Sequence, residues 1–406
     1  MCHDFRPTKP RPSMSTLDHF RADTRAWLEE NCPAGARGPG FIPIGSTTQD
    51  MEPDTRLWLE RMAEKGWTVP TWPKQYGGAE LDRDEYQVLV EELTAIGART
   101  PLTGRGVNYI GPTILEFGTD EQKAKWLPRC ARGEGAWAMG YSEPGAGSDL
   151  ASLSTKAELN GDHYLINGSK IWTSDATYCD YIFALVRTSP EKSKHEGISL
   201  VLIDMHQEGV KVSPIQLISG RSPFCETHFD NAVVPKEDLI GGVDNGWTVG
   251  KRLLQFERST HAGINISGSQ GGILERAPVT AWVRRYAGDE NGTIQDRDLR
   301  RWVDQFEINT HAQRLTQRRA IEELQSRAPG FTSSAVKLSN ALNIQDGDEL
   351  MVAAMGHQGQ RWDESADGEE LEIIKKWLYQ KSLTIAGGTK EVQLNIIAKR
   401  VLGLPD

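Results

Sequence analysis

Apolar residues follow three successive patterns along the chain. Over residues 16–136 they recur every three or four positions, for example at Leu17 and Phe20, which is the spacing of amphipathic helices. Over residues 136–242 they form short runs rich in β-branched and aromatic residues, such as YIFALVRT and ISLVLID, which predict strands. Helical spacing then returns for the remainder of the chain. Long helical segments are expected around 247–270, 297–327, 333–355 and 370–403.

This order predicts an α+β protein of three parts. We expect an N-terminal α-helical domain over 14–135, a middle antiparallel β-domain over 136–243 and a C-terminal α-helical bundle over 244–406. Helices and strands are segregated rather than alternating, which argues against a parallel βαβ fold. The pairs Asn160–Gly161 and Asn167–Gly168 separate consecutive strand-like runs, so each predicts a hairpin turn.

Composition and charge indicate an ordinary globular chain. Its 406 residues are 38% hydrophobic and carry a formal net charge of −10 without a sustained Lys/Arg run. These properties argue against nucleic acid or an anionic lipid surface as a partner. The chain has neither an apolar run of the roughly 18 residues that a membrane span requires nor the apolar core of a secretory signal at its start. We therefore expect a cytoplasmic location, and assign residues 1–13 no function.

Several common kinds of site lack support in the sequence. The five cysteines are far apart and form no CxxC pair, and the nine histidines show no metal-ligand spacing, so we expect neither a disulfide framework nor a metal site. The glycines at 145–147 do not belong to a GxGxxG fingerprint opening a βαβ unit, and GxxxxGK[ST] is absent. A nicotinamide fold, a P-loop enzyme and a zinc hydrolase are therefore disfavoured.

The stretch GYSEPGAGSDLASLSTKAEL, residues 140–159, carries the most specific chemistry. Its glycines allow backbone N–H groups to converge on an anion, and Ser142 and Ser148 add hydroxyl groups. The alternative is a tight loop that enters the sheet and binds nothing.

This stretch resembles the first signature of the acyl-CoA dehydrogenase family, which has the form T/S-E-P-x-A/G-G-S-D. SKIWTSDATYCDYIF at 169–183 resembles a second family motif, and GGTKEVQLNIIAKRVLGLP resembles the last helix. The resemblance extends from about residue 17 to the end. It implies the family's fold, with FAD held between the middle β-domain and the C-terminal bundle. It also implies an acyl-CoA substrate, an electron-transferring flavoprotein as electron acceptor, and a homo-oligomer, either dimer or tetramer, or a hetero-oligomer.

The resemblance assigns residues of the first two motifs to the cofactor. Ser142 would bond the pyrimidine side of the flavin, Trp172 would cover one ring face, and Ser174 would place a hydroxyl near N5. Gly147 belongs to the same loop, and Ser148 would lie near the CoA pyrophosphate. The alternatives are that Trp172 is a core residue of an amphipathic strand and that the serine hydroxyls only bond backbone.

Desaturating a thioester requires a carboxylate to remove the α proton. In many family members it precedes the GT of the C-terminal motif, where this chain has Gly387. Glu257, in the segment GWTVGKRLLQFERSTHAGINI, shares a largely apolar helix face with Leu253, Leu254 and Ile264. Burying such a carboxylate without a partner is costly, so burial increases its affinity for a proton. A higher proton affinity suits a general base.

The context LLQFER resembles family branches, including isovaleryl-CoA and long-chain dehydrogenases, that carry the base on this helix. The alternative is that Glu257 forms a buried ion pair with Arg252, Arg258 or His261.

The C-terminal motif then keeps a role without a carboxylate. By resemblance, the Gly387 N–H would bond the thioester carbonyl and stabilise enolate-like charge. Gly388 and Thr389 would lie against the flavin and its diphosphate, and Glu391 occupies a position near the cofactor where the family has Gln. Glu391 is also the next candidate for the base. A glycine-broken helix end without a ligand is the alternative.

Two family motifs are altered. The family's R-x-x-F-G motif binds the cofactor of a neighbouring subunit. This chain has VRRYAG in that region, where Arg284 or Arg285 would substitute for the motif's arginine. Q-x-x-G-G-x-G appears as AAMGHQG, which retains Gly356 and Gly359 but lacks the Gln. Three functions therefore stay open: a complete acyl-CoA dehydrogenase, a subunit that completes another chain's cofactor site, and a flavin oxidase. With no side chain at Gly387, there would be room for a branched or bulky acyl group.

Overall fold

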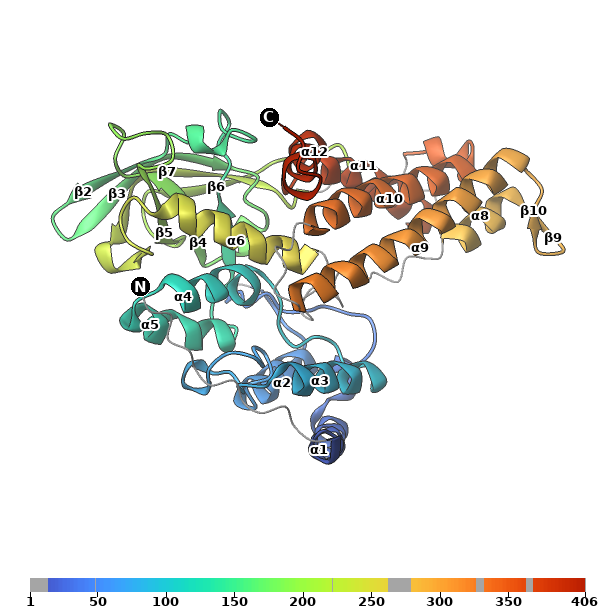
Figure 1. The fold of residues 1–406 in the computed structure, drawn as a ribbon, viewed down its shortest axis with the longest axis horizontal. Helices are drawn as coiled ribbons and strands as arrows, with labels where there is room; N and C mark the ends of the chain where they lie inside the picture. Colours follow the sequence, from blue (N-terminus) through green and yellow to red (C-terminus); the bar gives the residue numbers. More distant parts are fainter. Residues whose placement is uncertain are drawn as a thin grey trace.

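The computed structural model describes residues 14–47, 49–220, 222–261, 279–325, 332–362 and 368–405 (Figure 1). Helices form its first part. They are α1 (Met14–Asn31), α2 (Pro53–Glu64), α3 (Arg83–Ala95), α4 (Gly111–Phe117) and α5 (Asp120–Ala131), with the short turns η1 (Ala34–Ala36) and η2 (Lys74–Tyr76) and the π-helix η3 (Gly106–Ile110). Capping boxes at Asp82/Glu85 and Thr119/Gln122 set the starts of α3 and α5.

A single eight-stranded sheet forms the middle part. Its strands are β1 (Trp137–Gly140), β2 (Lys156–Asn160), β3 (His163–Ile171), β4 (Tyr181–Arg187), β5 (Ile198–Asp204), β6 (Val210–Pro214), β7 (Cys225–Pro235) and β8 (Leu239–Ile240). The short helices η4 (Leu150–Ser152), η5 (Ala176–Tyr178) and η6 (Lys236–Asp238) lie between them. The strand order is β6-β7-β3-β2-β4-β5-β8, with β1 also paired to β4.

The sheet corrects two expectations. Asn160–Gly161 does turn β2 into β3, but Asn167–Gly168 makes no hairpin, because β3 runs through it. Gly168 instead marks a bulge at which the register with β7 shifts, and a Cβ there would lie 2.8 Å from the Thr155 Cα. The sheet is also mixed rather than purely antiparallel, since β1 and β2 both pair with β4 in parallel.

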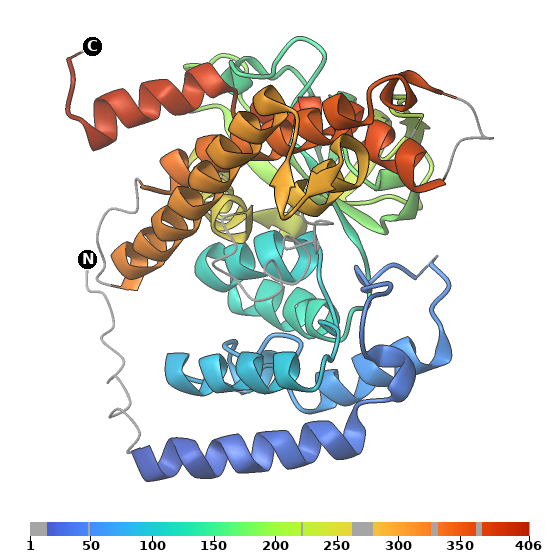
Figure 2. The ribbon, with the colours of Figure 1, turned by 90° about the vertical axis from the view of Figure 1, so that its right-hand side faces the viewer.

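The last part is again helical, so the predicted α+β class with its helix–sheet–helix order is confirmed. Its elements are α6 (Gly246–His261), α8 (Val279–Ala287), β9 (Asp289–Glu290), β10 (Thr293–Ile294), α9 (Arg297–Gln325), α10 (Thr332–Met355), η7 (Gln358–Gln360), α11 (Gly368–Gln380), η8 (Lys381–Thr384), α12 (Lys390–Ile396) and η9 (Ile397–Val401). Figure 2 shows α12 and η9 projecting beyond the bundle. The predicted helix over 247–270 is seen to His261, and Ile264 lies outside the described residues. Within the described ranges, no helix has the length and apolar character needed to cross a membrane.

Helix α6 joins the three parts of the molecule. It packs against β4 and β5, against η3 and α4, and against α10, and Figure 1 shows it between the sheet and the N-terminal helices. Its buried Val249 and Leu253 belong to the same hydrophobic core as Leu185 and Leu200 of the sheet and Ile114 of α4. A side chain near the end of α6 is therefore placed by all three parts at once.

Candidate active site

Glu257 lies on α6 where the three parts meet. It is partly buried, one turn after the fully buried Leu253. Burial raises the pKa of Tyr109 and of Tyr141, and the nearby carboxylate of Glu257 raises both pKa values further. Tyr109 belongs to η3 and Tyr141 follows β1 directly. Glu257 therefore faces phenol groups from the N-terminal helices and from the sheet.

The structure bears on one of the three ion pairs considered for Glu257, the pair with Arg252. The Arg252 guanidinium donates to Glu116 Oε2 at 2.8 Å and to Gln255 Oε1 at 2.7 Å. The side chains of Arg258 and His261 lie outside the described part of the structure.

The Gly387–Gly388 turn connects η8 to α12. Both glycines have left-handed backbone, with φ of +64° and +90°, which explains why side chains are avoided here. Gln393 Nε2 donates to the Gly387 carbonyl at 3.0 Å, and a Cβ on Gly388 would lie 2.7 Å from that nitrogen. Thr389 caps α12 by accepting a hydrogen bond from the Val392 N–H. The turn is thus a defined structure rather than a frayed helix end.

Lys337 of α10 links this turn to the surroundings of Glu257. Its Nζ donates to the Gly388 carbonyl at 2.6 Å and to the Leu383 carbonyl at 3.2 Å. Burial lowers the pKa of Lys337, and the negative charge of Glu257 opposes part of that shift. Glu257 and Gly387, the two positions considered for the base, are 130 residues apart in the sequence. Lys337 is linked to both segments: it donates a hydrogen bond to the glycine turn, and the charge of Glu257 acts on it.

Sequence reasoning missed Lys337, Tyr109 and Tyr141. The only signal for Lys337 was a single cation in the otherwise small and apolar stretch SSAVKLSNAL.

The signature loop is held by a buried ion pair. Lys170 Nζ lies 2.7 Å from Glu143 Oε1 and also donates to the Tyr141 carbonyl at 3.2 Å. Burial would raise the pKa of Glu143, but Lys170 and the donors of Ser154 and Thr155 hold it at about 2. Glu143 is thus a structural acceptor that holds the loop. Ser142 precedes it and is partly buried, and its carbonyl accepts from the Ile171 N–H at 2.9 Å.

Trp172 is not a core residue, contrary to the alternative kept open from the sequence. It follows the end of β3 with a left-handed φ of +62°, and its side chain is 53% exposed. A bulky residue in this region stores about 1–3 kcal/mol of strain, which commonly marks a functional position. Trp172 meets the edge of Phe224, whose ring stacks on Tyr379 of α11 with centroids 5.8 Å apart. Its exposed ring therefore lies next to the contact between the sheet and the C-terminal helices.

Ser174 lies two residues further along in the same turn and is partly buried. The buried Thr173 hydroxyl donates to the Cys225 carbonyl at 2.9 Å, which anchors the turn to β7. Asp175, also left-handed at φ +60°, pairs with Arg105 at 3.3 Å. Arg105 directly precedes η3, so this ion pair ties the turn to the element that carries Tyr109.

The remaining predicted residues lie at the surface. Gly147 and Ser148 are exposed, beside an Asp149 carboxylate that pairs with Lys194. Glu391 is exposed on the first turn of α12.

Two cavities adjoin these elements. One, of about 550 Å³, lies between α3, α4 and the end of α6; its lining includes Trp67, Trp72, Leu89, Val107 and Phe256. Phe256 immediately precedes Glu257, so this space, which is lined by both apolar and polar side chains, begins one residue from the candidate base.

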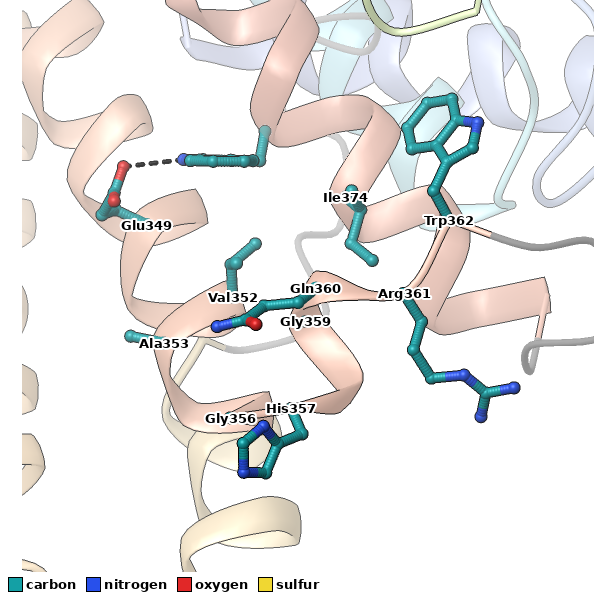
Figure 3. A pocket seen from close by; sticks show the side chains of 11 residues that line it. Glu349, Val352, Ala353, Gly356, His357, Gly359, Gln360, Arg361, Trp362 and Ile374 are labelled. Atoms are coloured by element: carbon teal, nitrogen blue, oxygen red, sulfur yellow. Dashed lines mark hydrogen bonds between the residues drawn. The ribbon is translucent and has the colours of Figure 1, made fainter.

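The other cavity, of about 570 Å³, lies between α10, η7 and α11. Figure 3 shows Glu349 on the opposite side of it from Arg361 and Trp362. The Glu349 carboxylate accepts from Trp377 Nε1 at 2.7 Å. Gly356 and Gly359 of the altered glycine motif form part of its wall.

The two arginines considered as substitutes in the altered R-x-x-F-G region lie on α8. Arg285 pairs with Glu369 of α11 at 2.7 Å, and Arg284 donates to the Gly292 carbonyl at 3.3 Å.

Comparison with known proteins decides the family. Residues 17–134, 138–232 and 244–402 match, respectively, the N-terminal, middle and C-terminal domains of acyl-CoA dehydrogenases. The chain belongs to the acyl-CoA dehydrogenase family. It is therefore an enzyme of the oxidoreductase class that acts on acyl-CoA thioesters, as the motifs predicted.

Similar proteins cover almost the whole chain. Acyl-CoA dehydrogenase IpdE1 of Mycobacterium tuberculosis is 34% identical over 399 residues, 97% of this chain and 99% of the relative. Among solved structures, the Tcur3481-Tcur3483 steroid acyl-CoA dehydrogenase is 31% identical with a TM-score of 0.73, covering 97% of this chain and 99% of that one. The ChsE4-ChsE5 complex of M. tuberculosis is 28% identical with a TM-score of 0.71, covering 98% and 100%.

Proposed function

We propose that this acyl-CoA dehydrogenase oxidises an acyl-CoA thioester between Cα and Cβ to the trans-2-enoyl product, with Glu257 as the acceptor of the α proton. The proposal rests on the packing of α6, which carries Glu257, against α10, whose Lys337 donates to the Gly388 carbonyl and interacts electrostatically with Glu257. A carboxylate and a backbone N–H in one neighbourhood supply the two functions that α-proton removal needs, a base and a donor for the developing oxyanion.

We propose that FAD, the general cofactor of the family, binds between the sheet and the C-terminal helices. The exposed, left-handed Trp172 and the hydroxyls of Ser142 and Ser174 fit this group, because they come together at the end of β3 beside α11. Gly388 and Thr389 would complete the site from the other side. Bound there, FAD would supply the acceptor for the β hydride. Gly147, Ser148 and Glu391 are further cofactor contacts predicted from the sequence.

The other residues near Glu257 orient the substrate and keep water away. The Gly387 N–H would bond the thioester carbonyl, which acidifies the α proton that Glu257 removes. The partly buried ring of Tyr109 and the buried ring of Tyr141 would limit the access of water to the carboxylate. Little water near the reacting carbon strengthens each electrostatic contact with it.

We infer a bulky or branched acyl group. The cavity beside Phe256 measures about 550 Å³, and large apolar side chains form part of its lining together with polar and charged ones. A Cβ on Gly387 would meet only the Lys337 Cε at 3.7 Å, so the turn adds no obstruction of its own. The similarity to a steroid acyl-CoA dehydrogenase points the same way.

For partners, we propose an electron-transferring flavoprotein as the electron acceptor and an oligomer as the working form, with a cytoplasmic location. The two similar solved structures are named as pairs of chains, which supports a hetero-oligomer as well as a homo-oligomer.

A second candidate function, completing the cofactor site of a partner subunit, is supported by the cavity between α10, η7 and α11. The cavity in Figure 3 carries aromatic and cationic side chains, Trp362, Arg361 and His357, that suit a nucleotide. It would let this chain complete the cofactor site of a partner subunit while catalysing little itself.

An anaerobic titration tests the first function. The purified chain is mixed with a panel of acyl-CoA thioesters, straight, branched and polycyclic, while its visible spectrum is recorded. We expect a flavin band that one thioester bleaches in the wild type and in Glu322→Gln, which alters an exposed carboxylate paired with Arg318. Glu257→Gln should bind that thioester but bleach at least about 1,000-fold more slowly, because it lacks the base.

Normal bleaching in Glu257→Gln would remove Glu257 from the mechanism. A chain that purifies without flavin, and gains it only with a second subunit, would support the cofactor-completing function. Rapid reoxidation by oxygen would identify an oxidase.

A further inference from the structure

Two side chains donate hydrogen bonds to three backbone carbonyls, two in the glycine turn and one in η8 directly before it. Lys337 Nζ holds those of Leu383 and Gly388, and Gln393 Nε2 holds that of Gly387. Two consecutive left-handed glycines have many alternative conformations of similar energy. With these carbonyls held by donors from α10 and α12, one conformation is selected. The peptides before and after the Gly387 N–H are thereby held, which limits the directions that this N–H can take.

Lys337 is suited to hold these carbonyls firmly. It is anchored on α10 between the buried Val336 and Leu338. A partly buried ammonium group also makes stronger hydrogen bonds to carbonyls than a neutral donor does. A Cβ on Gly387 would approach the Lys337 Cε to 3.7 Å, so the lysine stem lies along the turn itself.

The same ammonium group acts electrostatically on the candidate base. The charge of Glu257 acts on groups that include Tyr109 on η3, Tyr141 after β1 and Lys337 on α10. Arg105, directly before η3, also acts on Tyr109. Of these groups, Lys337 also donates a hydrogen bond to the glycine turn.

We propose that Lys337 is a positioning residue for the dehydrogenation: by holding the glycine turn, it presents the Gly387 N–H to the thioester oxygen. This inference rests on the proposed function, because it assumes that Glu257 and Gly387 act on the same thioester. Lys337 itself would act through the turn rather than on the reacting carbons.

The test compares Lys337→Met and Lys337→Arg with Lys251→Met, which removes a charge from an exposed position of α6. We expect Lys337→Met to lower kcat/KM about 100-fold, the loss typical of a misplaced catalytic group. Lys337→Arg, which keeps a charged donor, should restore most of the rate, and Lys251→Met should resemble the wild type.

Calorimetry supplies a readout without turnover. One ligand is an acyl-CoA in which sulfur replaces Cβ, so that no hydride is available, and the other is an S-alkyl-CoA thioether that lacks the carbonyl. We expect Lys337→Met to bind the first about tenfold more weakly and the second as the wild type does, the cost of roughly one hydrogen bond. If Lys337→Met does not fold, Lys337→Gln, a neutral donor, replaces it.

An unchanged kcat/KM in Lys337→Met, or an equal loss of affinity for both ligands, would overturn the positioning role even if Glu257→Gln is inactive. A wild type that bleaches with no thioester would instead defeat the proposed function.

Discussion

At the scale of single residues, the conformation of Trp172 is explained better by function than by stability. A tryptophan at φ +62° with 53% of its side chain exposed contributes little to the core and strains its own backbone. Such a residue is expected where a ring is needed at an open surface.

Replacing Trp172 by Asn, which tolerates left-handed backbone, should therefore leave the free energy of unfolding unchanged or raise it by about 1 kcal/mol. Flavin retention should nevertheless fall, because the ring that covers the isoalloxazine is lost. Tyr178→Asn is the matched control: its ring is 51% exposed, and its φ is not positive. Urea unfolding and the flavin-to-protein absorbance ratio provide the readouts. Equal flavin retention in the two variants would contradict the role of Trp172.

Residue types alone led to part of the site. Glu257 and Gly387 were found because one is a carboxylate on an apolar helix face and the other interrupts a helix. Lys337 was not found, because a lysine in a helix usually points to water. Its carbonyl acceptors lie 46 and 51 residues further along the chain. The roles of all these residues stay predictions.

At the scale of elements, the two glycines of the turn differ in how much a side chain at each position would cost in stability. Both glycines are left-handed, so an alanine at either costs about 1–2 kcal/mol in backbone strain. Their surroundings differ, because a Cβ on Gly388 meets Gln393 Nε2 at 2.7 Å while a Cβ on Gly387 has an ordinary contact with Lys337.

Gly388→Ala should destabilise the protein by about 1 kcal/mol more than Gly387→Ala, since it also displaces the Gln393 hydrogen bond. Thermal unfolding of the two variants, measured side by side, checks this difference. Equal losses would mean that Gln393 moves aside without cost, and that the turn is less firmly held than its contacts indicate.

Elements whose signals are local were predicted well, and elements set by distant pairing were not. The β2–β3 hairpin follows from Asn160–Gly161 because the turn itself decides it. Asn167–Gly168 carries the same local signal, but pairing of β3 with β7 on both sides of Gly168 overrides it and leaves a bulge. The parallel pairing of β1 with β4 joins strands more than forty residues apart, which no local pattern reveals.

At the scale of the whole molecule, the helix–sheet–helix order followed from periodicity, but the exposed surface of the bundle did not. Ile308 and Leu315 lie seven residues apart on α9, hence on one face, and are 62% and 55% exposed. Leu402 and Leu404 near the end of the chain are also exposed. An apolar face on a long helix suits the proposed oligomer, with a second copy of this chain as its partner.

The double variant Ile308→Lys/Leu315→Lys should therefore reduce the molecular mass in solution toward that of one chain, 45.1 kDa, because two buried lysines would oppose association. Light scattering after size exclusion provides the measurement. Leu159→Lys, on a β2 residue that is 58% exposed, should leave the assembly unchanged. An unaltered mass in the double variant would place the interface on another face.

The meeting of Glu257 with a turn 130 residues further along has a consequence for biosynthesis. At roughly 5–20 residues per second, a ribosome adds that stretch in about 7–26 s. Lys337 is the 80th of these residues to be added, so for most of the interval neither Lys337 nor the glycine turn can lie beside the carboxylate of α6. The nascent chain therefore carries its proposed proton acceptor before the groups that would direct it, and chemistry must wait for the last helices to be released.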